Sequence, residues 1–361
     1  MTTEEIVAEL AKTAEEDAPG RSMPGICYHD PEFFALEVER VLRPGWHAVA
    51  RWDELEEPGD YKSVNLFGED IVVLRDQSGT LRALSRICQH RGHTIVEGSG
   101  NSKRITCPYH LWTYNLEGEL VSAPFMDERS DFKTSDCKLP KFALEEWQGF
   151  ILVNLDPNAE PLAPQLTDVD EILSESNLNK AVVADVTDWD SPWNWKVMLE
   201  NFMESYHHIG PHSESLQKSN PAKGTHEMTV HGPCIALENP AAEGESRFWV
   251  FQIFPTLLFA QNRKYNPIAL WYEMQIDRHD HIHLRIHMLM PPELAAQKEM
   301  VEFGRAMITQ IHMEDIPVCE NVQSGTRSRA YTGGPLSMQE STLHSFHKML
   351  AEALQRIPGK A

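Results

Sequence analysis

The sequence predicts an α+β protein with two domains: an all-β domain, followed by a domain in which helices pack on an antiparallel sheet. From residue 46 to about residue 155, short β-prone runs alternate with Gly, Asp and Asn turns, which is typical of an all-β domain. The segment 158–166, NAEPLAPQL, contains two prolines and predicts a boundary. Beyond it, a strand-rich region over 226–290 precedes long helical patterns over 293–313 and 341–354. Strands followed by helices favour the α+β class.

Three segments follow from this pattern. Residues 1–45 are expected to be a helical, acidic lead-in that packs on the C-terminal domain, with one short helix in PEFFALEVERVL. Residues 46–160 are expected to form the all-β domain, and residues 161–361 the domain with the helix-covered sheet. The chain has 361 residues, of which 41% are hydrophobic, so it can supply a core to each domain.

The composition is acidic, with a formal net charge of −22. Nucleic acids and anionic membranes are bound through clusters of Lys and Arg, so we expect neither as a partner. No run of about twenty apolar residues occurs, and the acidic N-terminus lacks the basic and apolar regions of a signal peptide. Six scattered cysteines argue for reduced thiols rather than a disulfide framework. We therefore expect a soluble cytoplasmic protein.

Two short pairs of cysteine and histidine lie in loops of the all-β domain: Cys88-x-His90 and Cys107-x-x-His110. Two cysteines and two histidines can hold a structural zinc ion, so their number alone does not identify the metal. Zinc fingers usually pair cysteine with cysteine and histidine with histidine. Here each pair is mixed, as in a Rieske 2Fe-2S centre, where each loop supplies one ligand of each type. An iron–sulfur cluster is the favoured interpretation.

The segments C-x-H-R-G and C-P-Y-H-x-W-T-Y resemble the cluster-binding signature of Rieske non-haem iron oxygenases. This resemblance implies a Rieske domain over the all-β segment and a catalytic domain of the helix-grip type after it. It implies that Cys88 and Cys107 hold one iron of the cluster and that His90 and His110 hold the other. Trp112 either covers the cluster or is an ordinary core aromatic.

A second group of candidate ligands lies downstream, in the segment Glu204-x-x-His207-x4-His212. On a helix, Glu204 and His207 would share a face. Gly210 and Pro211 should break that helix and let His212 turn back, so that two imidazoles meet one metal. A non-haem Fe(II) site needs two histidines and one carboxylate.

The carboxylate ligand is expected in the segment IHMEDIPVCENVQSG. Asp315 is the favoured candidate because the resemblance implies an Asp followed eight residues later by Gln, here Gln323. The adjacent Glu314 is the alternative.

The resemblance also implies roles for Glu204 and Asn201. In similar oxygenases, a carboxylate at the place of Glu204 links a cluster histidine of one subunit to an iron-binding histidine of the next. Glu204 would then connect His110 of one protomer to His207 of its neighbour, and the protein would be a homotrimer. Asn201 either orients this connection or is a plain surface amide.

The expected activity is that of a terminal oxygenase, with one 2Fe-2S cluster and one mononuclear Fe(II) per chain and O2 as cosubstrate. No nucleotide-binding motif was found, because GSGNSK at 98–103 lacks the third glycine and the helix start. Electrons must then come indirectly from NAD(P)H through a separate reductase or ferredoxin. An aromatic ring-hydroxylating dioxygenase is an alternative. Rieske electron transfer without oxygenase activity and a zinc-stabilised module are alternatives of other classes.

The substrate is expected to be a small organic molecule. The segments MESYHHIGPH and EDIPVCENVQSG partly resemble oxygenases of quaternary amines such as glycine betaine, choline and carnitine, in which Glu fills the bridge position. Aromatic residues would then be candidates for a cationic cage, although core packing is their more usual role. These residues are Phe254, Phe259, Trp271 and Tyr272.

Overall fold

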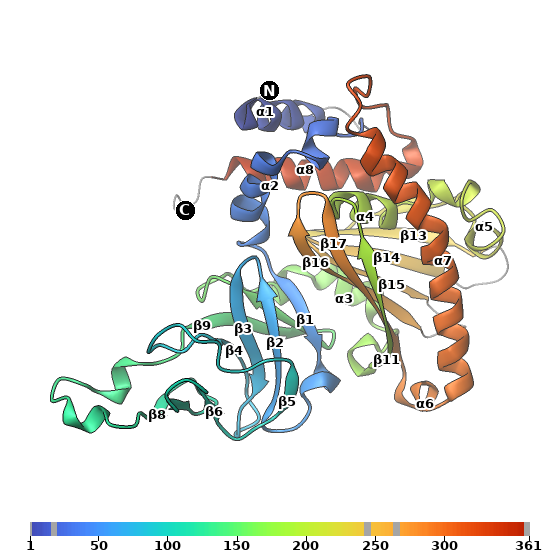
Figure 1. Ribbon diagram of the computed structural model, residues 1–361. Coiled ribbons are helices and arrows are strands. Elements are labelled where there is room, and N and C mark those ends of the chain that lie inside the picture. The colour runs from blue at the N-terminus through green and yellow to red at the C-terminus, as the bar shows by residue number, and fades with distance from the viewer. Residues whose placement is uncertain (1, 16–19, 242–246, 263–267, 357–361) are drawn as a thin grey trace. The chain divides into compact units, whose positions relative to one another are not determined.

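The computed structural model describes residues 2–15, 20–241, 247–262 and 268–356. The chain divides into two compact units. Residues 46–162 form one, which we call the β unit. Residues 1–45 join residues 163–361 in the other, which we call the α+β unit. Each unit has its own large sheet (Figure 1).

The β unit contains a seven-stranded antiparallel sheet in the order β1-β10-β9-β4-β3-β2-β5 and a three-stranded sheet in the order β6-β7-β8. The strands are β1 His47–Arg51, β2 Asp60–Leu66, β3 Glu69–Arg75, β4 Leu81–Ser85, β5 Ser99–Asn101, β6 Ile105–Thr106, β7 Thr113–Tyr114, β8 Leu120–Ser122, β9 Lys141–Trp147 and β10 Phe150–Asn154.

Strand β3 is buried on both faces, and its side chains serve two cores. Ile71 and Val73 point into a cluster with residues of β1 and β10, whereas Val72 and Leu74 point into a cluster on the opposite face. This division follows from the two-residue repeat of a strand. The second cluster extends to Cys88 and Cys107. A rigid apolar layer therefore supports both mixed pairs of ligand candidates.

The α+β unit is built on a seven-stranded antiparallel sheet in the order β11-β17-β16-β15-β14-β13-β12. Its strands are β11 Val182–Ser191, β12 His226–Met228, β13 Cys234–Pro240, β14 Arg247–Ile253, β15 Leu257–Asn262, β16 Ala269–Arg278 and β17 His281–Met290. The helices are α1 Thr3–Glu15, α2 Pro31–Glu37, α3 Thr167–Leu173, α4 Trp195–Phe202, α5 Leu216–Ser219, α6 Pro292–Ala295, α7 Lys298–Gly325 and α8 Ser341–Gln355. The fold class is thus the predicted one.

Two helices position the candidate site of this unit. The short helix α4 packs against the long helix α7, and α7 runs beside β11 (Figure 1). Asn194 caps α4, because its side chain accepts a hydrogen bond from the backbone N–H of Lys196. Gln323 on α7 joins the two helices, since its Oε1 accepts from the backbone N–H of Asn194 at 2.9 Å.

Strand β11 and helix α7 differ from the sequence-based expectations. Strand β11 was not predicted, because its outward side chains are acidic; Asp188 and Asp190 instead pair with histidines of β17. The predicted helix over 293–313 is α6 followed by α7, and α7 continues through Pro317 to Gly325. The side chain of Asn321 donates to the carbonyl of Pro317 at 2.6 Å, so one carbonyl near the proline is satisfied by a side chain.

The interior of the α+β unit contains a fully buried ion pair. Lys196 on α4 lies 2.8 Å from Glu37 at the end of α2, and both side chains are inaccessible to solvent. Removing either partner would leave an uncompensated buried charge, which is strongly destabilising. This pair ties the N-terminal segment to the start of α4.

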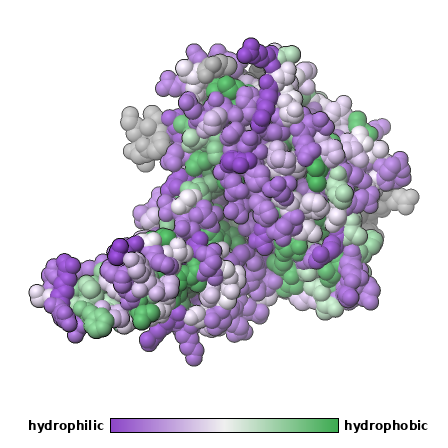
Figure 2. Space-filling view, viewed as in Figure 1, coloured by the Kyte–Doolittle hydropathy of each residue, from purple (hydrophilic) through white to green (hydrophobic). Residues whose placement is uncertain are grey.

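The face of the molecule in Figure 2 is mainly hydrophilic, with hydrophobic side chains scattered over it. In the part of the chain that the structure describes, no helix combines the length and the apolar character needed to cross a membrane.

Candidate metal centres

The two mixed pairs of the β unit lie in two loops, and each loop is closed by hydrogen bonds within its own backbone. The first loop follows β4; the N–H of Cys88 donates to the carbonyl of His93, and the N–H of Gly92 donates to that of Cys88. The second joins β6 to β7, and the N–H of Cys107 donates to the carbonyl of Trp112. Gly92 adopts a left-handed φ of 70°, which suits a residue without Cβ.

The loops bring the four predicted ligands together. Cys88 and Cys107 are buried in the same apolar cluster, and the rings of His90 and His110 lie 4.7 Å apart. Burial raises the pKa of the Cys107 thiol. Burial, with the charges of His110 and Arg91, lowers the pKa of His90. A neutral imidazole is the form that binds a metal.

One atom of this group indicates a ligand directly. His110 Nδ1 is buried and makes no hydrogen bond to any residue that the structure describes. An unpaired buried nitrogen is unfavourable unless something else binds it. Together with two buried thiols, it fits a metal cluster.

Aromatic residues pack around the four predicted ligands, among them Tyr109, whose ring centroid lies 3.8 Å from that of His110. Trp112 stacks on His90, with ring centroids 4.6 Å apart and planes 7° from parallel. The hydroxyl of Tyr114 lies 3.4 Å from Cys88 Sγ and accepts from the N–H of Gln89. Sequence analysis did not single out Tyr114, whose contact depends on how the second loop folds back on the first.

In the α+β unit, His207, His212 and Asp315 form a group whose potential ligand atoms all lie within 4.8 Å of one another. His212 Nε2 is 2.9 Å from Asp315 Oδ1, and His207 Nε2 is 3.7 Å from the same oxygen. The donor set is two imidazoles and one carboxylate, as in non-haem Fe(II) sites. Among the described residues, no other group of three or more His, Cys, Asp or Glu side chains meets this distance limit.

The backbone reaches this arrangement differently from the expectation. Glu204 and His207 do not share an α-helix, because α4 ends at Phe202 and His207 lies in a 3-10 turn over Tyr206–Ile209. Their contact comes instead from the carboxylate, which accepts from the backbone N–H of His207 at 3.1 Å and lies 2.5 Å from its Nδ1. The contact thus does not need a continuous helix.

Each histidine of the group is held by a second carboxylate. Glu204 binds Nδ1 of His207, and Glu314 binds Nδ1 of His212 at 2.6 Å. Ser215 also donates to Glu314, at 2.5 Å. Carboxylates that bind the outer nitrogen of a ligand histidine fix its tautomer and orientation. The geometry therefore groups Asp315 with the histidines and places Glu314 behind one of them.

Three further residues complete the surroundings. Asn201 donates to Asp315 Oδ1 at 3.2 Å, so its amide is directed at the candidate ligand rather than at solvent. Burial opposes protonation of His212, but the hydrogen bonds and charges of Asp315 and Glu314 raise its pKa overall. Burial, with the charge of His207, lowers the pKa of His208 to about 4, and its Nδ1 bonds to the carbonyl of Asn220. His208 is outside the group.

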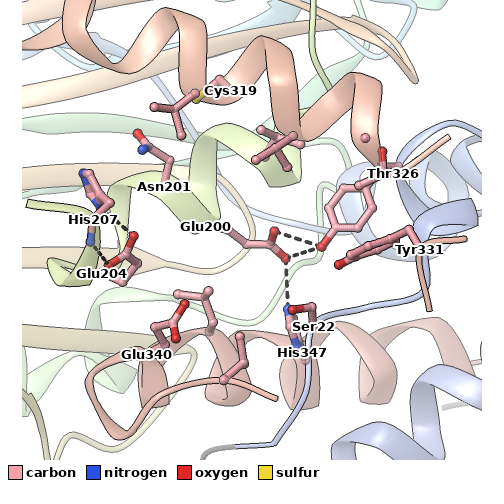
Figure 3. A pocket seen from close by; sticks show the side chains of 17 residues that line it. Ser22, Glu200, Asn201, Glu204, His207, Cys319, Thr326, Tyr331, Glu340 and His347 are labelled. Atoms are coloured by element: carbon pink, nitrogen blue, oxygen red, sulfur yellow. Dashed lines mark hydrogen bonds and ion pairs between the residues drawn. The ribbon is translucent and has the colours of Figure 1, made fainter. Parts of the chain in front are cut away.

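A cavity of about 340 Å³ lies between α4, α7 and α8, and its wall includes Glu204 and His207 (Figure 3). Glu200 on α4, four residues before Glu204, also lines it and accepts from His347 Nε2 at 2.9 Å. The hydroxyl of Tyr28 donates to the same carboxylate. Burial, with the charges of Glu204 and Glu200, raises the pKa of Glu340. This carboxylate-rich wall was not predicted, because Glu340 is far in the sequence from Glu200 and Glu204.

Comparison with known protein families gives two matches. Residues 45–143 match the Rieske 2Fe-2S domain, and residues 178–356 match the catalytic domain of the ring-hydroxylating alpha subunit. The first domain implies a 2Fe-2S cluster and the second a mononuclear iron. The donor sets described above fit both groups.

Curated relatives and solved structures agree with these matches. The oxygenase subunit of carnitine monooxygenase from Acinetobacter pittii (strain PHEA-2) is 31% identical, over 86% of this chain and 87% of that protein. The chloroplastic choline monooxygenase of Arabidopsis thaliana is 25% identical, over 97% of this chain and 88% of that protein. A crystal structure of the quaternary ammonium Rieske monooxygenase CntA has a TM-score of 0.84 at 26% identity and covers 98% of this chain and 99% of that chain. The predicted resemblance and fold class are confirmed.

Proposed function

This chain belongs to the Rieske oxygenases with a ring-hydroxylating alpha-subunit catalytic domain, and we propose that it is the terminal oxygenase of a multicomponent system acting on a small quaternary ammonium compound. As an enzyme of this family it is an oxidoreductase. The proposed reaction inserts one oxygen atom of O2 into a C–H bond and reduces the other to water. It consumes two electrons and two protons, and hydroxylation of an N-methyl group would lead to demethylation.

The observation that carries this proposal is the convergence of His207, His212 and Asp315. These residues would hold a ferrous ion, and the chemistry that such an ion supplies when bound is the reductive activation of O2. Asn201 holds the Asp315 carboxylate in place, at 3.2 Å. Glu204 and Glu314 fix the outer nitrogens of the histidines, so that both Nε2 atoms face the same point.

Cys88, Cys107, His90 and His110 would hold the 2Fe-2S cluster, which would supply electrons singly. Histidine ligation raises the potential of such a cluster above that of an all-cysteine cluster. The thiols are buried among apolar residues, whereas His90 and His110 lie toward the surface of the unit. Histidine ligands near the surface suit electron transfer between the cluster and other proteins.

We propose that electrons pass between protomers of a homotrimer, with Glu204 connecting His110 of one protomer to His207 of the next. The contact of Glu204 with His207 supports the second half of this route. Glu204 also lines the 340 Å³ cavity, so its carboxylate can be reached from outside the α4–α7 pair. A separate reductase or ferredoxin, supplied by NAD(P)H, would reduce the cluster.

The substrate class rests on the curated relatives. Carnitine and choline monooxygenases align with most of this chain, and both names specify quaternary ammonium alcohols. Glu204 also supports this substrate class, since a Glu rather than an Asp at the bridge position resembles the oxygenases of quaternary amines. We therefore propose carnitine, choline or glycine betaine chemistry ahead of aromatic dihydroxylation.

A substrate screen with a surrogate reductase tests the proposal. Purified protein, NADH and each ammonium compound are incubated while O2 uptake is followed, and products are identified by mass. We expect substrate-dependent O2 uptake and a product that has gained one oxygen atom or lost a methyl group. Conversion of naphthalene or indole to a cis-diol, with no turnover of any ammonium compound, would contradict the proposed substrate class.

A further inference from the structure

The layer between α7 and the sheet contains polar groups that the proposed metal sites do not use. The buried residues of α7 in this region recur at spacings of three and four, as Ile308, His312, Asp315 and Cys319. His312 therefore lies one helical turn before the candidate iron ligand Asp315, on the same stripe. Its side chain is fully buried.

Both ring nitrogens of His312 lack a hydrogen-bond partner among the described residues. The same is true of Ser191 Oγ at the end of β11 and of Trp193 Nε1 two residues later, and these residues are 0% and 1% exposed. The rings of Trp193 and His312 are 6.5 Å apart, and the ring of Trp189 lies 4.6 Å from His312. His312 and Trp193 thus leave polar atoms unsatisfied side by side, and Ser191, two residues before Trp193, leaves its buried hydroxyl unsatisfied.

Such groups reduce the stability of the fold unless something binds them. Burial lowers the pKa of His312 to about 4, so the ring is neutral near pH 7 and presents one donor and one acceptor. The indole N–H of Trp193 can only donate, and the hydroxyl of Ser191 can donate as well. The chemical complement of this group is an oxygen atom with free lone pairs.

We propose that His312, Trp193 and Ser191 form a buried oxygen-binding site that takes the polar end, a hydroxyl or carboxylate oxygen, of the substrate. The position of His312 on α7 places this site one helical turn from the candidate iron ligand Asp315. The indoles of Trp189 and Trp193 add aromatic faces beside it, which attract an ammonium group. The site would thus select ammonium compounds by their oxygen substituents, and it rests on the substrate class proposed above.

An internal water molecule has the same hydrogen-bonding chemistry, and the experiment separates the two. Iron-loaded protein is titrated without O2, by calorimetry, with L-carnitine, γ-butyrobetaine, choline and tetramethylammonium. The variants are His312→Leu, which removes both nitrogens at similar volume, and His312→Gln, which keeps a donor and an acceptor. His287→Leu is the matched control, because His287 is also buried and ring-stacked, but its Nε2 bonds to Glu273 at 2.6 Å and only its Nδ1 has no partner among the described residues.

We expect His312→Leu to weaken binding of the oxygen-bearing compounds at least tenfold and to change tetramethylammonium binding less than twofold. His312→Gln should recover most of the lost affinity, and His287→Leu should show no dependence on the substrate's oxygen. Equal effects on all four compounds, or none, would overturn the proposal.

Melting temperatures without substrate provide a test that does not depend on the substrate class. Because His312→Leu and Ser191→Ala remove unpaired polar atoms, we expect each to melt at or above the wild-type temperature. A clear decrease in both, restored by His312→Gln, would show that an internal water already satisfies these atoms, and the proposal would fail. If the wild type bound no ammonium compound, the proposed function would fail. The melting temperatures would then still test whether the polar atoms of His312 and Ser191 are unsatisfied.

Discussion

The two candidate metal centres are built in opposite ways. The cluster residues lie close together in sequence, between positions 88 and 110, on two loops that backbone hydrogen bonds close. The iron group joins His207 and His212 to Asp315, about a hundred residues away, and depends on side-chain contacts between α4, the following turn and α7. One site is local, whereas the other exists only when the α+β unit is folded.

This difference determines what supports each site. Around the cluster, two thiols are held in an apolar layer that β3 anchors. Around the iron group, polar side chains give the support: the carboxylates of Glu204 and Glu314 hold the imidazoles, and the amide of Asn201 holds Asp315. Single substitutions should therefore separate the two centres.

The largest effect is expected from Asp315→Ala. Removing the carboxylate should release the mononuclear iron and abolish turnover, while the cluster keeps its visible absorption because none of its candidate ligands changes. Iron analysis combined with the visible spectrum measures both. If the variant kept its full iron content and turned over substrate, Asp315 would not be a ligand.

Glu204→Gln should leave both centres loaded and reduce turnover by about 10- to 100-fold, the usual range for outer partners of metal ligands. Gln keeps the shape of the side chain but loses the charge of the proposed bridge. The reduced cluster should reoxidise slowly when substrate and O2 are added, which stopped-flow absorbance records. Wild-type reoxidation rates would remove Glu204 from the electron route.

Glu314→Gln should weaken metal binding by about tenfold, because Glu314 fixes the outer nitrogen of His212. Titration of the iron-free protein with Co(II) gives the affinity and the ligand-field spectrum. Ser215→Ala removes only the hydroxyl that donates to Glu314, so it should have a smaller effect. Complete loss of metal in Glu314→Gln, together with a fully loaded Asp315→Ala, would reverse the roles of the two carboxylates.

The smallest effect is expected from Asp76→Asn in the β unit. Against the effect of burial, hydrogen bonds from Ser78, Thr80 and Arg82 lower the pKa of Asp76 to about 2. Because this pKa is below the unfolded value of about 3.9, the stabilisation is complete above pH 4 and is lost as the pH falls toward 2. The variant should lose about 1–2 kcal/mol at pH 7.

Urea unfolding of the β unit within the whole protein measures this difference. It should shrink between pH 4 and pH 2, and at pH 7 the variant and the wild type should contain the same amount of metal in the α+β unit. A loss of equal size at pH 7 and pH 2 would assign the effect to packing rather than to the charge of Asp76.

The same contrast explains how far sequence analysis reached. The mixed pairs at Cys88 and Cys107 are informative because local spacing determines a local site, and the family matches confirm the Rieske domain. The all-β domain and the helix-covered sheet were predicted correctly. The pairing of His207 with His212 was predicted from their spacing, whereas Asp315 was chosen through the family resemblance. That ligand set stays a prediction although the structure brings its members together.

Other features could not be predicted, for identifiable reasons. Strand β11 was missed because its acidic side chains are compensated by histidines of β17, which single-sequence patterns do not show. Glu204 contacts His207 through a 3-10 turn rather than along a helix. The contact between Glu314 and His212 joins residues 102 positions apart, and no local signal indicates it.

The central claim is that each chain carries a Rieske cluster and a separate mononuclear iron. Iron stoichiometry with electron paramagnetic resonance tests this claim most directly. Wild-type protein should contain about three iron atoms per chain and show the signal of a reduced Rieske cluster, whereas Asp315→Ala should contain about two and keep that signal unchanged. Zinc in place of iron, or a wild-type iron content that already equals that of Asp315→Ala, would contradict it.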